Sequence, residues 1–241
     1  MLTNDDKKFL ELYSDSEYEK PSVTVDAVIF RIKSEENKNY RKLPQKKLQV
    51  YLTKRQYPPF KGQFSVVGTF IDLKHELGET MKLCVKNKVN LDNYYFEQLF
   101  TFGDKSRDPR TRVLSISYML LTNCDEELEN GEWFDVELNE TQLNTTNTKN
   151  GYITKKQIEM VLKNQNQKLE NSFEITNTKT GLEEIKTIDI KNNTLAFDHT
   201  KIIYYALERL KNKLEYREAV PKRPALWELC FWILSEIQRP R

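Results

Sequence analysis

Residues 22–32 have the sequence SVTVDAVIFRI, which is dominated by β-branched and aromatic side chains. Such side chains favour an extended backbone, so this stretch predicts one long β-strand. The charged residues 33–47 show no hydrophobic period and predict a loop, after which residues 48–53 (LQVYLT) resume the apolar pattern. Two strands joined in this way predict a β-hairpin near the start of the chain.

Working outward from this hairpin, the chain alternates between strand and helix patterns. A short apolar strand at 64–67 is expected to end at Gly68. Residues 76–88 place Leu77, Met81, Cys84 and Val85 on one helical face and predict a helix. The other predicted elements are strands at 94–102, 112–121 and 131–137, and a short polar helix or extended lead-in at 5–19. This order is typical of an α/β domain.

The composition changes between residues 138 and 193, where Asn, Thr, Lys and Glu dominate. A short helix at 155–168 and strands at 173–176 and 185–190 are predicted there. The segment is interpreted as a polar insertion with its own hairpin.

Two helices are predicted in the remainder of the chain. Asp198 offers an N-cap for the first, and the apolar stripe of that helix consists of Ile202, Ile203, Ala206, Leu207, Leu210 and Leu214. The second covers residues 226–237 (LWELCFWILSEI). The predicted organisation is therefore a domain at 1–137, a polar insertion or linker at 138–194 and a C-terminal helical region at 195–241.

Charge and composition exclude several classes of protein. The 38 Lys and Arg residues nearly balance the 36 Asp and Glu residues, so any contact with DNA must be local. Cys84, Cys124 and Cys230 are widely spaced and accompanied by only two histidines, which argues against a zinc site or a disulfide framework. The chain has neither a long apolar run nor a signal-peptide pattern. We expect a soluble, cytoplasmic protein without a membrane partner.

Three groups of residues carry a resemblance to a known family. They are residues 23–30 with 48–60, residues 68–91, and residues 99–118, whose sequence LFTFGDKSRDPRTRVLSISY is the most specific. Together they resemble the Nudix-related transcriptional regulators of NAD metabolism and their near relatives among Nudix proteins. This resemblance implies a Nudix-type α/β/α sandwich with a mixed sheet. It also implies an ADP-ribose-like nucleotide as ligand, DNA as a partner and a homodimer in a bacterial cytoplasm.

The hydrolase motif of that family is degenerate here. By the resemblance, the positions of its glycines, arginine and glutamates are occupied by Thr69, His75, Leu83, Cys84, Asn87, Lys88 and Asn90. Nudix hydrolases hold Mg²⁺ with carboxylates, and Lys88 would place a cation where that metal belongs. We therefore expect no hydrolysis, no catalytic residue, no metal site and no cofactor.

The resemblance also selects candidate ligand-binding residues, chiefly arginines and the loop around residues 103–110. They are Arg55, Phe60, Thr69, Phe70, Asp72, Asp104, Arg107, Asp108, Arg110 and Arg112. Arginine binds phosphate through paired hydrogen bonds, and residues 57–60 (YPPF) would supply an apolar wall. The alternative for the loop is a set of internal Asp–Arg salt bridges. His75 is expected to be a surface helix-cap residue, and His199 a structural one.

Three functional hypotheses remain open at this stage. In the first, the chain senses an ADP-ribose-like nucleotide and regulates transcription. The family places a winged helix-turn-helix after residues 197–216, but the residues beyond Tyr216 are too few for a complete one, so DNA binding is in question. In the second, Asp72, Glu76 or Glu79 rebuild a site for Mg²⁺ in a divergent nucleoside diphosphate-sugar pyrophosphatase. In the third, the apolar C-terminal helix makes the chain an interaction module.

Overall fold

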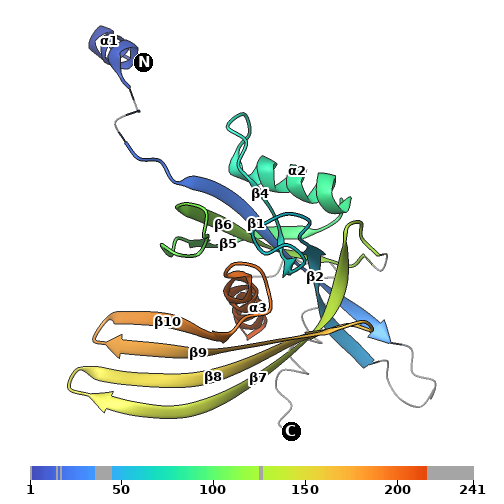
Figure 1. Ribbon diagram of the computed structural model, residues 1–241. Helices are drawn as coiled ribbons and strands as arrows, with labels where there is room; N and C mark the ends of the chain where they lie inside the picture. Colours follow the sequence, from blue (N-terminus) through green and yellow to red (C-terminus); the bar gives the residue numbers. More distant parts are fainter. Residues whose placement is uncertain (1, 15, 17, 36–44, 125–126, 216–241) are drawn as a thin grey trace.

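The computed structural model describes residues 2–14, 16, 18–35, 45–124 and 127–215 (Figure 1). In chain order, its elements are α1 (Asn4–Leu12), β1 (Ser22–Glu35), β2 (Gln45–Lys54), β3 (Phe64–Ser65), β4 (Val67–Phe70), α2 (Leu77–Val89), β5 (Tyr95–Phe102), β6 (Val113–Thr122), β7 (Gly131–Thr148), β8 (Gly151–Lys163), β9 (Lys168–Thr180), β10 (Glu183–Asn192) and α3 (His199–Glu215).

The strands form one mixed sheet with β1 near its centre. The main path has the order β10-β9-β8-β7-β2-β1-β6-β5, while β3 pairs with β2 and β4 pairs with β1. β1 and β2 are antiparallel, which confirms the predicted hairpin. β1 and β6 are parallel over ten residue pairs. The centre of the sheet therefore joins two segments that lie far apart in the sequence.

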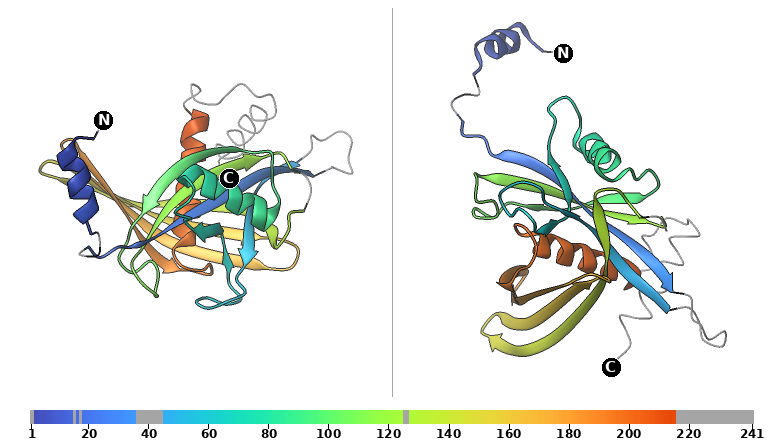
Figure 2. Two further views of the ribbon diagram at one scale, coloured as in Figure 1. Left: turned by 90° about the horizontal axis from the view of Figure 1, so that it is seen from above. Right: turned by 45° about the vertical axis from the view of Figure 1, so that its right-hand side comes forward.

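Both faces of β1 are buried, each against a different helix. Val25, Ala27 and Ile29 belong to the apolar cluster that includes the inner face of α2. Val28 and Phe30 belong to the other cluster, which includes the apolar stripe of α3. Because side chains alternate along a strand, one apolar run serves both layers. Figure 2 shows α2 and α3 on opposite sides of β1.

Helix α2 confirms the predicted helix at 76–88. Its buried face includes Met81, Cys84 and Val85. The helix ends at Asn90, whose φ of 53° lies in the left-handed region and whose N–H donates to the carbonyl of Lys86. A residue in this conformation ends a helix because its backbone turns away from the helical path.

The predicted helix at 155–168 is wrong. These residues form most of β8 and the start of β9, and Ile158, Met160 and Leu162 are buried at alternate positions. Alternation with a period of two is typical of a strand with one buried face. The lysines before these side chains and the apolar Val161 between two of them obscured that alternation in the sequence.

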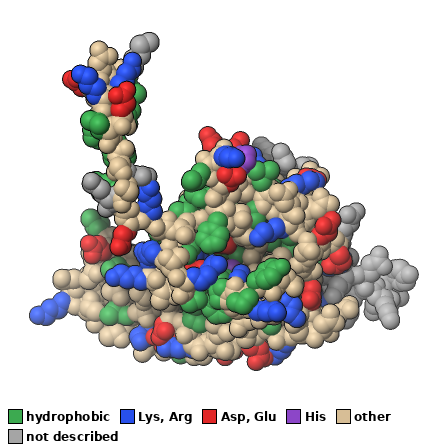
Figure 3. Space-filling model, turned by 45° about the horizontal axis from the view of Figure 1, so that its top comes forward, with side chains coloured by type: hydrophobic (Ala, Val, Ile, Leu, Met, Phe, Trp, Pro, Cys, Tyr) green, Lys and Arg blue, Asp and Glu red, His purple; other side chains and the backbone are tan. Residues whose placement is uncertain are grey.

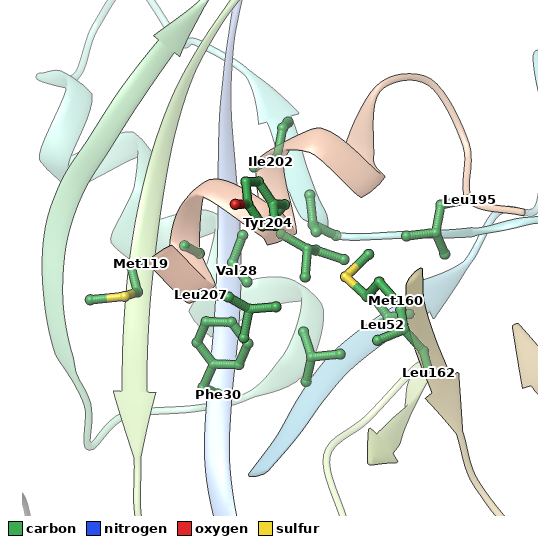
Figure 4. Packing of buried hydrophobic residues seen from close by; sticks show 14 of the residues in the cluster. Val28, Phe30, Leu52, Met119, Met160, Leu162, Leu195, Ile202, Tyr204 and Leu207 are labelled. Atoms are coloured by element: carbon green, nitrogen blue, oxygen red, sulfur yellow. The ribbon is translucent and has the colours of Figure 1, made fainter. Parts of the chain in front are cut away.

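Residues 138–193 extend the main sheet instead of forming a separate hairpin. β7 runs from Gly131 to Thr148, through the predicted boundary at residue 137. The predicted strands at 173–176 and 185–190 are confirmed within the longer β9 and β10. Figure 1 shows α3 between β7–β10 and the rest of the sheet, and Figure 4 shows Met160 and Leu162 on the α3 side of these strands. The four strands thus complete the core around α3.

Helix α3 confirms the predicted C-terminal stripe as far as Leu210. Ile202, Ile203, Ala206, Leu207 and Leu210 are buried. The side chain of Leu214 and the helix predicted at 226–237 lie outside the described residues.

At the other end of the chain, α1 confirms the helical alternative for 5–19 only as far as Leu12. It has no buried residue and stands away from the body of the molecule (Figure 3). None of the described helices is long and apolar enough to cross a membrane.

Candidate functional site

A cavity of about 750 Å³ opens beside the central strand β1. β1, β2, β3 and β4, the end of α2, the loop before β6 and the residues that lead into α3 all contribute to its wall. The lining includes Thr24, Asp26, Lys54, Arg55, Thr69, Phe70, Asn87, Lys88, Arg107, Asp108, Arg110, Glu132, Phe197 and His199. Segments distant in sequence thus meet around one space.

Six of the predicted ligand-binding residues line this cavity. They are Arg55, Thr69, Phe70, Arg107, Asp108 and Arg110. The other four candidates, Phe60, Asp72, Asp104 and Arg112, are absent from its lining. Asp72 accepts a hydrogen bond from the backbone N–H of Lys74 at 2.9 Å, and Asp104 forms an ion pair with Lys201 at 2.6 Å. The ring of Phe60 lies 4.8 Å from that of Phe197, which does line the cavity.

Arg107 forms an internal salt bridge with an aspartate, which is the alternative to ligand binding that the sequence left open for this loop. It is buried, and its Nε and Nη2 donate to the two carboxylate oxygens of Asp198 at 3.0 and 2.8 Å. Such a bidentate pair fixes both position and orientation. It ties the loop before β6 to the start of α3, where the Asp198 carbonyl also accepts from the N–H groups of Lys201 and Ile202.

Arg55 and Arg110 lie at one aromatic ring. Their guanidinium carbons are 4.7 and 5.6 Å from the centre of the Phe197 ring. Arg110 also lies 5.4 Å from the Phe70 ring and donates from Nε and Nη2 to Asp108. Burial lowers the pKa of Arg55, and the neighbouring Arg110 lowers it further. Two cations share a partly desolvated wall, and an anion in the cavity would relieve their repulsion.

Phe197 occupies a backbone conformation that is unusual for its residue type. Its φ is 53°, and that of Phe60, which packs against it edge to face, is 61°. A bulky side chain in the left-handed region costs energy and persists only where surrounding contacts hold it. Ring packing and two flanking guanidinium groups provide those contacts here.

His199 connects α3 to the strands on the cavity's edge. Its Nδ1 accepts a hydrogen bond from the backbone N–H of Val66 at 3.1 Å, and the side chain is buried. Burial lowers the pKa of His199, although Asp26 and Asp198 oppose this effect. The neutral ring is the form that can accept at Nδ1. This contact agrees with the structural role expected for His199.

Asp26 is a cavity residue that the sequence patterns did not single out. It is buried, and it accepts hydrogen bonds from the hydroxyls of Thr24 and Ser115. Its Oδ2 lies 3.9 Å from Nη2 of Arg107. The signal in the sequence was a single acid within the strand predicted at 22–32, because a buried charge needs partners from elsewhere in the fold.

The single strand expected at 64–67 is divided into β3, which pairs with β2, and β4, which pairs with β1 and continues through Gly68 to Phe70, with Gly68 opposite Asp26. A Cβ atom on residue 68 would lie only 1.9 Å from Oδ1 of Asp26, so the approach requires glycine. The Gly68 carbonyl accepts a hydrogen bond from Nζ of Lys88 at the end of α2.

The donor set beside α2 does not fit a magnesium ion. Asn87 and Lys88 line the cavity there, while Cys84 is buried in the core and burial raises its pKa to about 11. Mg²⁺ is held by oxygen ligands, usually including carboxylates. Among the residues that the structure describes, no three His, Cys, Asp or Glu side chains gather closely enough to hold a metal ion.

The acids near the start of α2 do not line the cavity. Oε2 of Glu79 accepts from the backbone N–H of Glu76 at 3.2 Å, which caps the helix. The exposed His75 lies between Asp72 and Glu79, with its ring nitrogens 3.9 and 3.7 Å from their carboxylates. The prediction of a surface position for His75 is confirmed, but the N-cap residue of α2 is Glu76.

Two proteins of known role are similar to this chain in sequence. The ADPR responsive transcriptional repressor NtrR of Acinetobacter baylyi is 28% identical over 142 residues, which cover 55% of this chain and 52% of that protein. The ADP-ribose pyrophosphatase of Methanocaldococcus jannaschii is 26% identical over 124 residues, which cover 49% and 64%. The chain therefore spans less than two thirds of either relative. No family model matches it.

Solved structures share the fold. The match to a MutT/nudix family protein from Enterococcus faecalis has a TM-score of 0.58 and 24% identity, covering 89% of this chain and 71% of that one. The match to the NUDIX domain of Shewanella oneidensis NrtR, solved with ADP ribose, has a TM-score of 0.50 and 21% identity, covering 87% and 99%.

Proposed function

Because the chain has the predicted Nudix-type α/β/α fold with a mixed sheet, we propose that it is an ADP-ribose-sensing transcriptional regulator without hydrolase activity. One observation carries this proposal: Arg55 and Arg110 meet at the ring of Phe197 in the wall of a cavity large enough for a nucleotide. Guanidinium groups suit phosphate, and the exposed ring of Phe70 in the cavity lining suits a base or ribose. The similarity to an ADPR-responsive repressor supports the same ligand.

Calorimetric titration of the purified full chain with ADP-ribose tests the ligand. We expect saturable binding with one site per chain, because the cavity offers one cluster of arginines. Ribose 5-phosphate, which lacks the diphosphate and the adenine, serves as the control and should bind much more weakly. A titration without any saturable heat would rule out ADP-ribose as the ligand.

Gel-shift assays with promoter DNA test the regulatory part. Residues 216–241, where the counterpart of the winged helix is predicted, lie outside the described residues, so the assay needs the full chain. A DNA reader should bind with a steep dependence on salt, and ADP-ribose should change that affinity. Light scattering on the same sample tests the homodimer that we propose for the DNA-binding form. Salt-independent or absent DNA binding would leave only the sensing function.

A second candidate is an ADP-ribose pyrophosphatase, which the similarity to the Methanocaldococcus jannaschii enzyme favours. It has weaker support because Asp72, Glu76 and Glu79 do not line the cavity. Incubation with ADP-ribose and Mg²⁺ separates the candidates, since release of AMP would establish the enzyme and displace the first proposal.

A further inference from the structure

One lysine in the last turn of α2, Lys88, reaches the cavity. Lys88 forms no ion pair with a carboxylate among the described residues. Nζ of Lys88 donates to the carbonyl of Gly68, and Lys88 lines the cavity. The other two lysines of this helix have different partners. Lys86 forms an ion pair with Asp92 at 2.6 Å, and Lys82 lies 5.0 Å from the ring centre of Phe96. Of these three lysines, only Lys88 lines the cavity.

The position of Lys88 is fixed by the backbone around it. Gly68 pairs with Asp26 in the β1–β4 ladder, and its close approach leaves no space for a side chain. The carbonyl of Lys88 itself accepts a hydrogen bond from Nδ2 of Asn130 at 2.9 Å. An ammonium group has three N–H donors, and the Gly68 carbonyl takes one. Two donors remain for oxygen atoms of a ligand.

The charges around the cavity favour an anion. Its lining includes five basic side chains, Lys54, Arg55, Lys88, Arg107 and Arg110, against three acidic ones, Asp26, Asp108 and Glu132. Arg107 and Arg110 are paired with Asp198 and Asp108. Beyond these two pairs, the three basic side chains Lys54, Arg55 and Lys88 face the two acidic ones Asp26 and Glu132, and a carbonyl dipole does not neutralise the ammonium charge of Lys88, so the cavity remains positive. A second cation such as Mg²⁺ beside Lys88 would be repelled.

We propose that the Lys88 ammonium binds the diphosphate of the ligand directly, in place of a divalent cation, so that ligand binding is independent of metal. This inference rests on the proposed function for the identity of the nucleotide, but its chemistry concerns the diphosphate alone. The residue at the end of α2 then converts a site that would need Mg²⁺ into one that senses the nucleotide at any Mg²⁺ concentration.

Calorimetry with the full chain tests the metal dependence. ADP-ribose and inorganic pyrophosphate are each titrated in excess EDTA and in millimolar Mg²⁺. We expect the affinity for ADP-ribose to differ less than about threefold between the two conditions. Binding of ADP-ribose only in the presence of Mg²⁺ would overturn the inference and leave the proposed ligand intact. Metal-free binding of pyrophosphate without binding of ADP-ribose would support the inference and refute the proposed ligand. Failure to bind either would refute both.

Substitutions at Lys88 test the residue. Lys88→Met keeps the length of the side chain and removes the charge, and we expect a loss of affinity of about tenfold or more for both ligands, as for other charge-assisted hydrogen bonds. Lys82→Met removes a lysine from the same helix outside the cavity and should leave the affinity unchanged. Lys88→Arg keeps the charge and should retain most of the binding.

Circular dichroism melts of each variant separate binding from folding. If Lys88→Met lowers the melting temperature while its affinity equals that of the wild type, Lys88 is only a structural link to Gly68 and the inference fails. If Lys88→Met does not fold, Lys88→Arg and Lys88→Gln decide: retained affinity in the first with loss in the second supports the inference, and equal affinity in both overturns it.

Discussion

Arg110 joins three parts of the cavity wall, since its guanidinium pairs with Asp108 and lies near the rings of Phe70 and Phe197. Replacing it with alanine removes a cation from the site and leaves Asp108, which is buried, without its nearest partner. We predict that Arg110→Ala weakens binding of ADP-ribose by about tenfold or more. Calorimetric titration of the variant measures the effect.

Arg112 provides the matched control for this experiment. It lies two residues further along the same loop and is absent from the cavity lining. Arg112→Ala should therefore bind ADP-ribose with the affinity of the wild type. An Arg110→Ala variant with unchanged affinity would show that the Asp108–Arg110 pair only shapes the loop.

His199 predicts a pH dependence of stability. Burial lowers its pKa in the folded state, and Arg107 acts in the same direction, whereas the unfolded chain takes up a proton near pH 6.5. Between these two pKa values the unfolded state binds more protons, so the free energy of unfolding rises with pH through this window. The stabilising contribution of neutral His199 reaches its full value above about pH 6.5. Acidification from neutral pH should thus destabilise the protein.

Urea titrations at several pH values between about 5 and 7.5 measure this contribution. His199→Asn retains an acceptor for the Val66 N–H but does not titrate. We expect the wild type to be the more stable protein at neutral pH and the difference to shrink as the pH falls. Parallel pH profiles for the two proteins would show that His199 does not carry the effect.

At the scale of single residues, the sequence selected the arginines of the cavity but not the residues that contact them. Arg55 and Arg110, which the family resemblance selected, both line the cavity, because their loops adjoin recognisable strands. The sequence did not select Asp26 or Phe197 as site residues. Asp26 appears there as an acid within a predicted strand, and Phe197 appears as the residue before an N-cap. Their roles depend on Arg107, Arg55 and Arg110, which approach from distant segments.

Helix α2 shows how a single residue type can end an element. Asn90 has a φ of 53°, a conformation that asparagine and glycine tolerate better than alanine does. We predict that Asn90→Ala lowers the free energy of unfolding by about 1 kcal/mol, mainly through backbone strain. Urea denaturation followed by circular dichroism gives the difference.

Asn90→Gly is the informative companion variant. Glycine adopts this φ without strain, so the variant should lie within about 0.5 kcal/mol of the wild type. If both variants destabilise equally, the effect comes from the long hydrogen bond between Asn90 Nδ2 and Glu129 at 3.5 Å instead of the backbone.

Elements with a strong apolar period were predictable, whereas β8 in the polar segment was not. β1, β2, α2 and α3 carry long apolar patterns, and the structure confirms each. In β8 the decisive residues Ile158, Met160 and Leu162 are separated by Glu159 and Val161 and preceded by Lys155 and Lys156. Helix and strand templates both fit such a segment in isolation, and pairing with β7 and β9 decides the outcome.

For the whole molecule, the strands β8–β10 are part of the core. The residues that they bury against α3 include Ile158, Met160, Leu162, Phe173 and Ile175. We predict that deletion of residues 149–192 abolishes cooperative folding, because burial of five large apolar side chains contributes on the order of 10 kcal/mol, comparable with the whole stability of a domain. A thermal melt followed by circular dichroism should lose its sigmoidal transition.

Deletion of residues 2–13 is the control for this experiment. That segment contains α1, which buries none of its residues. The shortened chain should melt within a few degrees of the full chain. A cooperative, native-like melt of the chain lacking residues 149–192 would instead establish that segment as the dispensable insertion that its polar composition indicated.

The parallel pairing of β1 with β6 has a consequence for folding during translation. Each of the ten paired residues of β1 meets a partner about ninety positions later in the chain. A ribosome adds roughly 5–20 residues per second, so β1 waits several seconds for that neighbour during translation. The hairpin with β2 covers its other edge much earlier. The nascent chain is thus most exposed to wrong partners, and most in need of a chaperone, in the interval before Thr122 leaves the exit tunnel.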